Sequence, residues 1–249
     1  MNIPVRALAI ILAVAFAIGA PAFQNATGWG LTAAEFAQSG NTTLRAAGYA
    51  FSIWGLLYLG FVIYAAYQVL PRNASNAALK ILGWPSALAI AGCGAWILAA
   101  AVDARWPSVA IIVLSAAVLT TGLLRAGKGK SPSVLEWLMV WWPLGLLAGW
   151  LTIASAVNIL TVMTAEGLLR PGQAPLAAAG GLLVVLAVAL SVLRASGLIP
   201  YAAAVAWGFV AVWAAERGDQ PLIAALALGC AVVLGLFAAW MVRPNAGRR

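Results

Sequence analysis

The chain has 249 residues, of which 64% are apolar and 8% charged, and its formal net charge is +8. A soluble domain is about half apolar and about one quarter charged, and a single core of this length cannot hide so much apolar surface. A water-soluble enzyme, a disordered chain and a disulfide scaffold are therefore excluded, and the sequence predicts a polytopic membrane protein. Histidine is absent, which excludes imidazole-ligated haem or metal and histidine acid–base chemistry.

Eight apolar runs are long enough to cross a bilayer, which takes about 20 residues of helix. In chain order they are Ile3–Ala20, Tyr49–Leu70, Leu82–Val102, Pro107–Leu124, Pro143–Met163, Pro175–Leu193, Leu198–Ala215 and Pro221–Val242. Pro21 and Pro71 are expected to end the first two runs. The predicted fold is all-α: a transmembrane bundle with five helices in residues 1–165 and a three-helix extension in residues 166–249. An alternative for the first run is a cleaved secretory signal, which leaves seven spans.

Charged residues sort between the two sides of such a bundle. One side holds Arg6, Arg72, Lys80, Arg125, Lys128, Lys130, Arg194, Arg243, Arg248 and Arg249, and the other holds only Arg45, Arg105, Arg170 and Arg217. Of the six acidic residues, only Glu136 falls on the first side. Because cytoplasmic loops are enriched in Lys and Arg, both termini are predicted to be cytoplasmic. The basic residues lie in short gaps between spans, so membrane lipid is the expected partner and nucleic acid is not.

Two segments outside the spans have predicted roles. Pro21–Gly48 is a long loop on the non-cytoplasmic side, and its apolar residues Trp29 and Phe36 favour folding back over the bundle as a lid. Ser133–Trp142 precedes Pro143 and is predicted to form a short helix at the membrane interface, with its tryptophans at headgroup level.

Two predicted helices carry aromatic faces that suit a ligand pocket. In the fifth span, Trp150, Ala154 and Asn158 follow i, i+4, i+8 spacing and share one face. In the second span, Phe51, Trp54 and Tyr58 do the same by i, i+3, i+7 spacing. Two such faces would line an apolar pocket with few polar groups, which is the usual character of a ligand site.

A purely structural interpretation of the same residues stays open. Asn158 also suits a hydrogen bond between helices, and Trp54 and Trp150 also suit filling of the bundle core. The small residues between Ala91 and Ala100 favour close helix packing, either within the chain or across a homodimer. No metal-ligand spacing, phosphate loop or intramembrane acidic pair is present in the sequence, which argues against an ion-driven pump and against an enzyme.

The motif Gly48-Tyr-Ala-Phe-Ser-Ile-Trp-Gly-Leu-Leu-Tyr58, then Trp96, then the segment Gly149–Asn158, resembles the tryptophan-rich sensory protein (TspO) family, relatives of the mitochondrial translocator protein. The resemblance covers roughly residues 1–163. Short members have five helices, so the last three helices are additional, and Cys93 stands where members usually have asparagine. Phe51 is also one residue closer to Trp54 than in those members.

The resemblance implies a membrane receptor or carrier, often dimeric, that binds porphyrins, sterols or other aromatic ligands under its first loop. By matching motif, it places Trp54, Tyr58, Trp150, Ala154 and Asn158 in the site, with Tyr49, Phe51 and Trp96 as further candidates. The predicted function is binding of a flat apolar ligand such as a tetrapyrrole, without another cofactor, in a bacterial inner membrane. The alternatives are a scaffold or assembly factor of a membrane pigment or respiratory complex, and a membrane enzyme acting on a lipid or isoprenoid.

Overall fold

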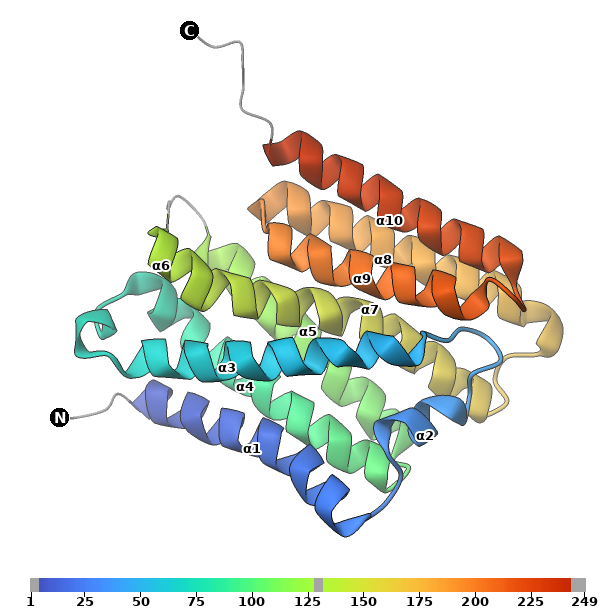
Figure 1. Ribbon diagram of the computed structural model, residues 1–249, viewed down its shortest axis with the longest axis horizontal. Helices are drawn as coiled ribbons and strands as arrows, with labels where there is room; N and C mark the ends of the chain where they lie inside the picture. The colour runs from blue at the N-terminus through green and yellow to red at the C-terminus, as the bar shows by residue number, and fades with distance from the viewer. Residues whose placement is uncertain (1–4, 128–131, 243–249) are drawn as a thin grey trace, which may run out of the picture.

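The computed structural model describes residues 5–127 and 132–242, and these residues form helices joined by short connections (Figure 1). The elements are α1 (Val5–Thr27), α2 (Ala33–Gln38), η1 (Gly48–Ser52), α3 (Ile53–Val69), η2 (Pro71–Asn73), α4 (Ala77–Ala101), α5 (Arg105–Ala126), α6 (Val134–Glu136), η3 (Trp137–Trp141), α7 (Trp142–Ala165), η4 (Pro171–Gln173), α8 (Ala174–Ser196), α9 (Ile199–Glu216) and α10 (Pro221–Val242). Within the described residues, eight helical segments are long and apolar enough to span a membrane. The predicted helical bundle and its eight spans are confirmed.

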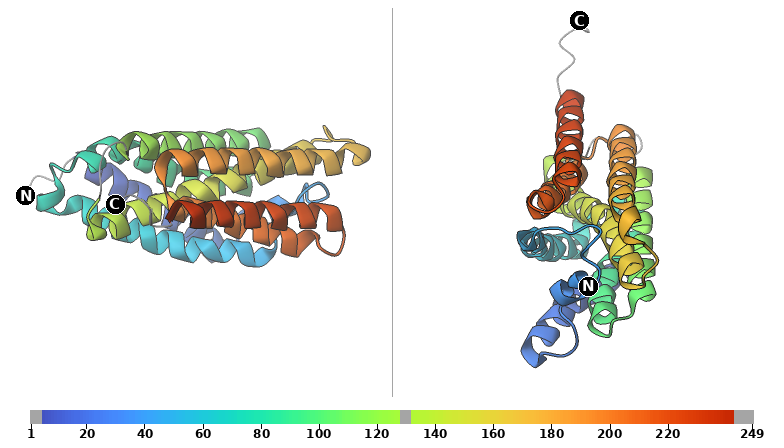
Figure 2. Two further views of the ribbon diagram at one scale, coloured as in Figure 1. Left: turned by 90° about the horizontal axis from the view of Figure 1, so that it is seen from above. Right: turned by 90° about the vertical axis from the view of Figure 1, so that its right-hand side faces the viewer.

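Helix α7 is the central element of the bundle. It packs against α3 and α5 on one side and against α8 and α9 on the other, while α1 and α10 lie at opposite edges (Figures 1 and 2). Its side chains join one hydrophobic core that runs from α1 to α10. Residues on both sides of the predicted domain boundary at residue 165 therefore belong to the same hydrophobic core.

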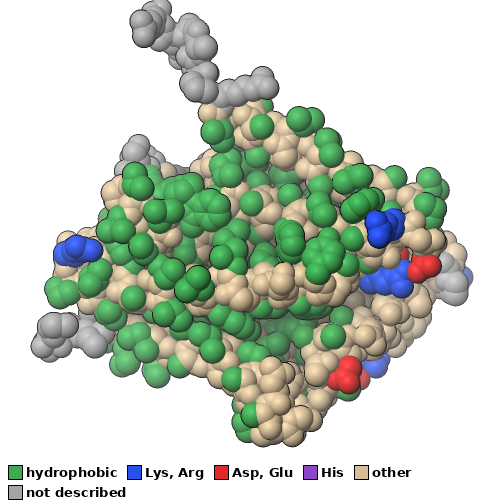
Figure 3. Space-filling model, viewed as in Figure 1, with side chains coloured by type: hydrophobic (Ala, Val, Ile, Leu, Met, Phe, Trp, Pro, Cys, Tyr) green, Lys and Arg blue, Asp and Glu red, His purple; other side chains and the backbone are tan. Residues whose placement is uncertain are grey.

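The helices alternate in direction, so the connections gather at two ends of the bundle. At the lid end, Arg105 at the start of α5 pairs with Glu166 after α7, with 2.9 Å between Nη1 and Oε1. At the opposite end, Asn76 before α4 donates to Glu136 of α6 over 3.0 Å. The face drawn in Figure 3 shows acidic side chains only toward the lid end. Lys128, Lys130, Arg243, Arg248 and Arg249, which the charge argument also used, lie outside the described residues.

The prediction that Pro21 ends the first helix is wrong. Helix α1 continues through Pro21 to Thr27, whose Oγ1 donates to the carbonyl of Phe23 over 2.8 Å. Proline removes one backbone hydrogen bond, and membrane helices tolerate this because neighbouring groups satisfy the freed carbonyl. The connection to the second span is consequently Gly28–Ala47, which is shorter than the predicted lid.

Helix α4 also begins before Leu82, because Asn76 caps it by accepting from the amide of Leu79 over 3.1 Å.

The prediction of a separate interfacial helix before Pro143 is also wrong. Residues 134–165 form one continuous helical segment with a π-helical turn at Trp137–Trp141. Pro143 has no N–H to donate, and the wider turn accommodates that gap in the helical hydrogen-bond ladder. Trp141 is buried, with its Nε1 donating to Glu136 over 3.3 Å, so its indole packs inside the bundle.

Side chains of α1, α3 and α4 form a buried polar network near the opposite end. The hydroxyl groups of Tyr64 and Ser86 share a hydrogen bond of 2.7 Å, and Gln68 donates to Tyr64 over 2.8 Å. Arg6 then donates to the carboxamide oxygen of Gln68 over 3.3 Å. Because each of these buried groups has a partner, the network holds three helices together and closes the bundle between them.

Candidate functional site

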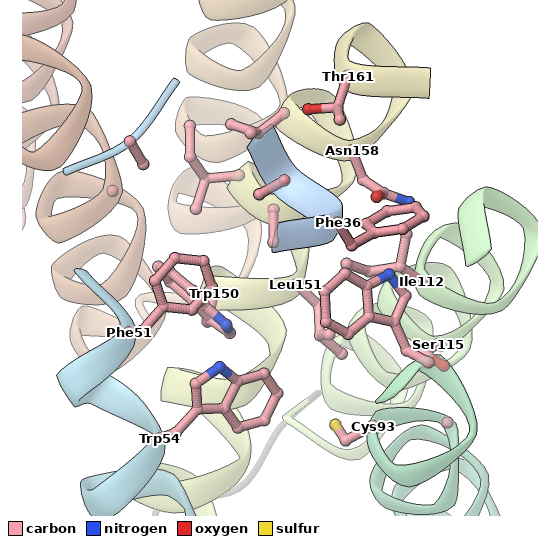
Figure 4. A pocket seen from close by; sticks show the side chains of 18 residues that line it. Phe36, Phe51, Trp54, Cys93, Ile112, Ser115, Trp150, Leu151, Asn158 and Thr161 are labelled. Atoms are coloured by element: carbon pink, nitrogen blue, oxygen red, sulfur yellow. The ribbon is translucent and has the colours of Figure 1, made fainter. Parts of the chain in front are cut away.

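An apolar cavity of about 80 Å³ lies inside the bundle beneath the connection between α1 and α3 (Figure 4). Helices α3, α4, α5, α7 and α9 and the connection contribute its lining: Phe36, Ala37, Ala46, Phe51, Trp54, Gly92, Cys93, Trp96, Ile112, Ser115, Trp150, Leu151, Ile153, Ala154, Val157, Asn158, Thr161 and Gly208. None of these described lining residues is charged. The cavity therefore suits an apolar molecule that makes few hydrogen bonds.

Trp54 and Trp150 face this cavity together. Their rings lie edge to face, with centroids 6.5 Å apart and planes at 85°. Phe51 packs edge to face on the other part of Trp150, with centroids also 6.5 Å apart. Figure 4 shows the three rings on one side of the cavity, opposite Phe36, Ile112 and Ser115. The spacing argument from the sequence correctly placed both tryptophans on one wall.

Ala154 and Asn158 continue the same face of α7 along the cavity. Ala154 leaves space beside Trp150 because its side chain is only a methyl group. Asn158 is buried and donates from Nδ2 to the hydroxyl of Ser108 on α5 over 3.1 Å. The carboxamide of Asn158 thus lines the cavity and also joins two helices. Its position is compatible with both a ligand-binding and a structural role.

The other predicted site residues divide into two groups. Phe51 and Trp96 line the cavity, whereas Tyr58 and Tyr49 are not among its described lining. Tyr58 stacks on Trp54, with ring centroids 5.5 Å apart, so it contacts one ring of the cavity wall. Tyr49 is 43% exposed and packs against Trp207 of α9.

The segment Gly28–Ala47, here called the lid, covers the cavity and inserts one ring into it. Its helix α2 begins with a capping box, in which Thr32 accepts from the amide of Glu35 and Glu35 accepts from the amide of Thr32. The amide of Thr32 and then its hydroxyl donate to the carboxylate of Glu35 over 2.7 and 2.8 Å, and these two hydrogen bonds lower the pKa of Glu35. The helix presents Phe36, which is buried against Trp96 at a centroid distance of 5.9 Å.

Glycine lets the lid approach α7 closely. A Cβ atom at Gly40 would collide with the backbone carbonyl of Thr161, so a larger residue there would lift the lid. Nearby, Thr164 donates to the hydroxyl of Thr43 over 2.7 Å. The lid is therefore seated on the end of α7 that carries Asn158.

Sequence reasoning missed Ser115 and Gly208 as parts of the cavity wall. Ser115 comes from α5, which shows no aromatic pattern, and Gly208 comes from α9 of the C-terminal extension. Gly208 lies directly against Ile153 of α7, where a Cβ atom would not fit. The sequence around each residue contains no pattern that predicts a cavity wall, because each reaches the cavity only through the packing of its helix against α7.

Asn158→Ala is expected to lower the free energy of unfolding by about 1 kcal/mol, since it removes the hydrogen bond to Ser108 between α5 and α7. Chemical unfolding in detergent micelles measures this loss. Ser155→Ala is the control, because Ser155 bonds only the carbonyl of Leu151 in its own helix. Equal stability of the two variants would contradict a structural role for Asn158. If ligand binding falls in Asn158→Ala but not in Ser108→Ala, the carboxamide contacts the ligand itself.

Comparison with known proteins identifies the family to which this chain is similar. The family model described as "TSPO-like protein" matches residues 6–240. The match includes the three C-terminal helices, so the similarity extends beyond the residues 1–163 in which the sequence motifs lie. No curated protein and no solved structure matches the chain. The chain forms an eight-span helical bundle whose central helix carries Trp150, Ala154 and Asn158 on one face. Because the family model matches nearly its whole length, the chain belongs to the TSPO-like protein family.

Proposed function

We propose that the protein is a membrane receptor or carrier for a flat, largely apolar ligand, with a tetrapyrrole as the leading candidate. The observation that carries the proposal is the wall formed by Trp54 and Trp150 in an uncharged cavity under a lid. Indole rings offer flat surfaces for stacking, and buried apolar area drives the association. We further propose a bacterial cytoplasmic membrane with both termini inside, on the basis of the charge distribution.

The size of the cavity sets a condition on this function. Sites for drug-sized ligands measure about 300–1,000 Å³, whereas this cavity measures about 80 Å³. A tetrapyrrole therefore requires the lid to move and Phe36 to leave its position against Trp96.

The test is titration of the purified protein with protoporphyrin, followed by the absorbance and fluorescence of the porphyrin. Trp150→Ala is expected to weaken binding by about 1–3 kcal/mol, the usual cost of losing one aromatic stacking platform. Trp84→Ala is the matched control, because Trp84 is 55% exposed on the outside of α4. Following the porphyrin avoids the change in protein fluorescence that each tryptophan substitution brings.

Three results would contradict the proposal. If Trp150→Ala and Trp84→Ala bind with equal affinity, the porphyrin does not stack in the cavity. If the native protein binds no porphyrin and purifies within a large membrane complex, the tryptophans serve packing and the protein acts as a scaffold. Turnover of a labelled lipid or isoprenoid by the purified protein would instead indicate an enzyme.

A further inference from the structure

We infer that the C-terminal extension is a working part of the ligand site, because α9 holds the lid closed through a clasp of Arg45, Glu216 and Asp219. Arg45 belongs to the lid, and the two acidic residues lie at the end of α9 and just beyond it. The inference rests on the cavity and its lid, and it holds whichever ligand the cavity takes.

The clasp is built around a carboxylate that is fully buried. The side chain of Glu216 is 0% exposed, and its Oε1 accepts from the backbone amide of Arg45 over 2.9 Å. The guanidinium of Arg45 lies beside the same oxygen, with Nε at 3.5 Å. Its Nη2 also donates to the carbonyl of Ala215 over 3.2 Å and pairs with Asp219. The hydrogen bond to Asp219 raises the pKa of Arg45, so the cation persists at any ordinary pH.

The partners of Glu216 make its burial dependent on the lid. Among the described residues, the groups that donate to or neutralise its carboxylate are Arg45 and Gln220 of the following turn. Gln220 is neutral, so the lid supplies the positive charge. Removing one partner of a buried ion pair is strongly unfavourable, because the remaining charge is left without compensation. Opening of the lid at Arg45 would leave Glu216 in that condition.

Two further hydrogen bonds join α9 to the last residue of the lid and to the chain just after it. The amide of Ala47 donates to the carbonyl of Ala211, which precedes Glu216 in α9, over 3.0 Å. The indole of Trp207 donates to the carbonyl of Ala50 over 3.2 Å. The same helix lines the cavity at Gly208. Helix α9 thus touches the chain on both sides of Gly48 and forms part of the cavity wall, so it couples the extension to lid position.

Cys93 provides a direct measure of lid opening without any ligand. It lines the cavity and is 3% exposed, whereas the second cysteine, Cys230 of α10, is buried outside the cavity lining. Alkylation with N-ethylmaleimide, quantified for each cysteine by mass spectrometry, therefore compares lid opening with general loosening in one molecule. Glu216→Gln keeps the shape of the side chain but removes the charge that holds Arg45.

Glu216→Gln is expected to raise the alkylation rate of Cys93 about tenfold while leaving that of Cys230 unchanged, because the lost charge-assisted hydrogen bond favoured the closed lid. Arg45→Gln should raise it similarly, and the double variant should show little further increase, since the two residues act as one unit. Asp219→Asn removes the exposed part of the clasp, since the Asp219 side chain is 69% exposed, and should raise the rate less than Glu216→Gln does. Arg217→Gln, at a neighbouring residue whose guanidinium lies over Trp213, is the matched control and should change the rate less than twofold. Arg45→Lys should retain part of the protection.

Three outcomes would overturn the inference. Equal increases at Cys93 and Cys230 would mean that the substitution only loosens the extension. Additive effects of Arg45→Gln and Glu216→Gln would mean that the two residues do not act together. If Cys93 resists the reagent in every variant, hydrogen exchange of the lid amides decides, and unchanged protection in Glu216→Gln would then contradict the clasp. Loss of porphyrin binding with a normal clasp would count against the proposed function alone.

Discussion

Ala154→Phe is expected to weaken protoporphyrin binding at least about 100-fold, which corresponds to about 2.8 kcal/mol. Ala154 lies between Trp150 and Asn158 on the wall of α7, and its methyl group faces a cavity of about 80 Å³. A phenyl ring at this position would fill most of that space and take the place of the ligand. Filling a cavity generally adds stability, so the thermal unfolding temperature in detergent should stay level or rise.

The combination of lost binding and retained stability distinguishes a blocked site from a damaged fold. Ala110→Phe on α5 is the control, because Ala110 is exposed and is not part of the cavity lining. It should bind porphyrin like the native protein. Native affinity in Ala154→Phe, with normal stability, would place the porphyrin outside this cavity.

Gly149→Leu is expected to lower the free energy of unfolding by about 3 kcal/mol and to separate the extension from the first five helices. A Cβ atom at Gly149 would collide with the backbone carbonyl of Tyr201 and touch the Cβ of Ala204 at 3.0 Å. Because both obstacles belong to or lie next to the backbone of α9, rotamer changes cannot relieve them. Small residues at such a crossing let two membrane helices approach closely, and overpacking the crossing is costly.

Gly55→Leu is the matched control for this substitution. Gly55 lies on an exposed face of α3, and a Cβ atom there has no neighbour within 4 Å. Denaturant titration in micelles should show a large loss for Gly149→Leu and little change for Gly55→Leu. The distance between α7 and α9, measured with a pair of spin labels, should increase only in the first variant. Equal stability of the two variants would show that the α7–α9 contact contributes little.

Hydropathy alone predicted the fold class, because each span must satisfy its own backbone hydrogen bonds within an apolar run. It did not predict how proline acts inside those runs. Pro21 does not end α1, and Pro143 does not divide its span, and membrane helices generally tolerate proline in their interior. Pro71, by contrast, does end the second span, since it follows Leu70 in an extended conformation.

The candidate site was predictable where its residues follow helical spacing along an aromatic face, as they do in α3 and α7. Trp150, Ala154 and Asn158 follow directly from helical spacing. Phe36 was predictable as an apolar residue in a long loop, although its contact with Trp96 was not. The pairing of Arg45 with Glu216 crosses 171 positions of sequence and depends on how α9 packs against α7. No local pattern reports a contact of that kind.

The lid and its clasp lie at one end of the bundle, while the network of Tyr64, Ser86 and Gln68 joins helices at the other. If the proposed ligand exchanges through the lid, the cavity comes to equilibrium with the ligand in one compartment or leaflet only. Occupancy then reports the supply on that side, and no net flux across the membrane follows from opening and closing the lid. Such one-sided exchange suits a sensor, whereas a carrier would need the buried network at the opposite end to open in alternation.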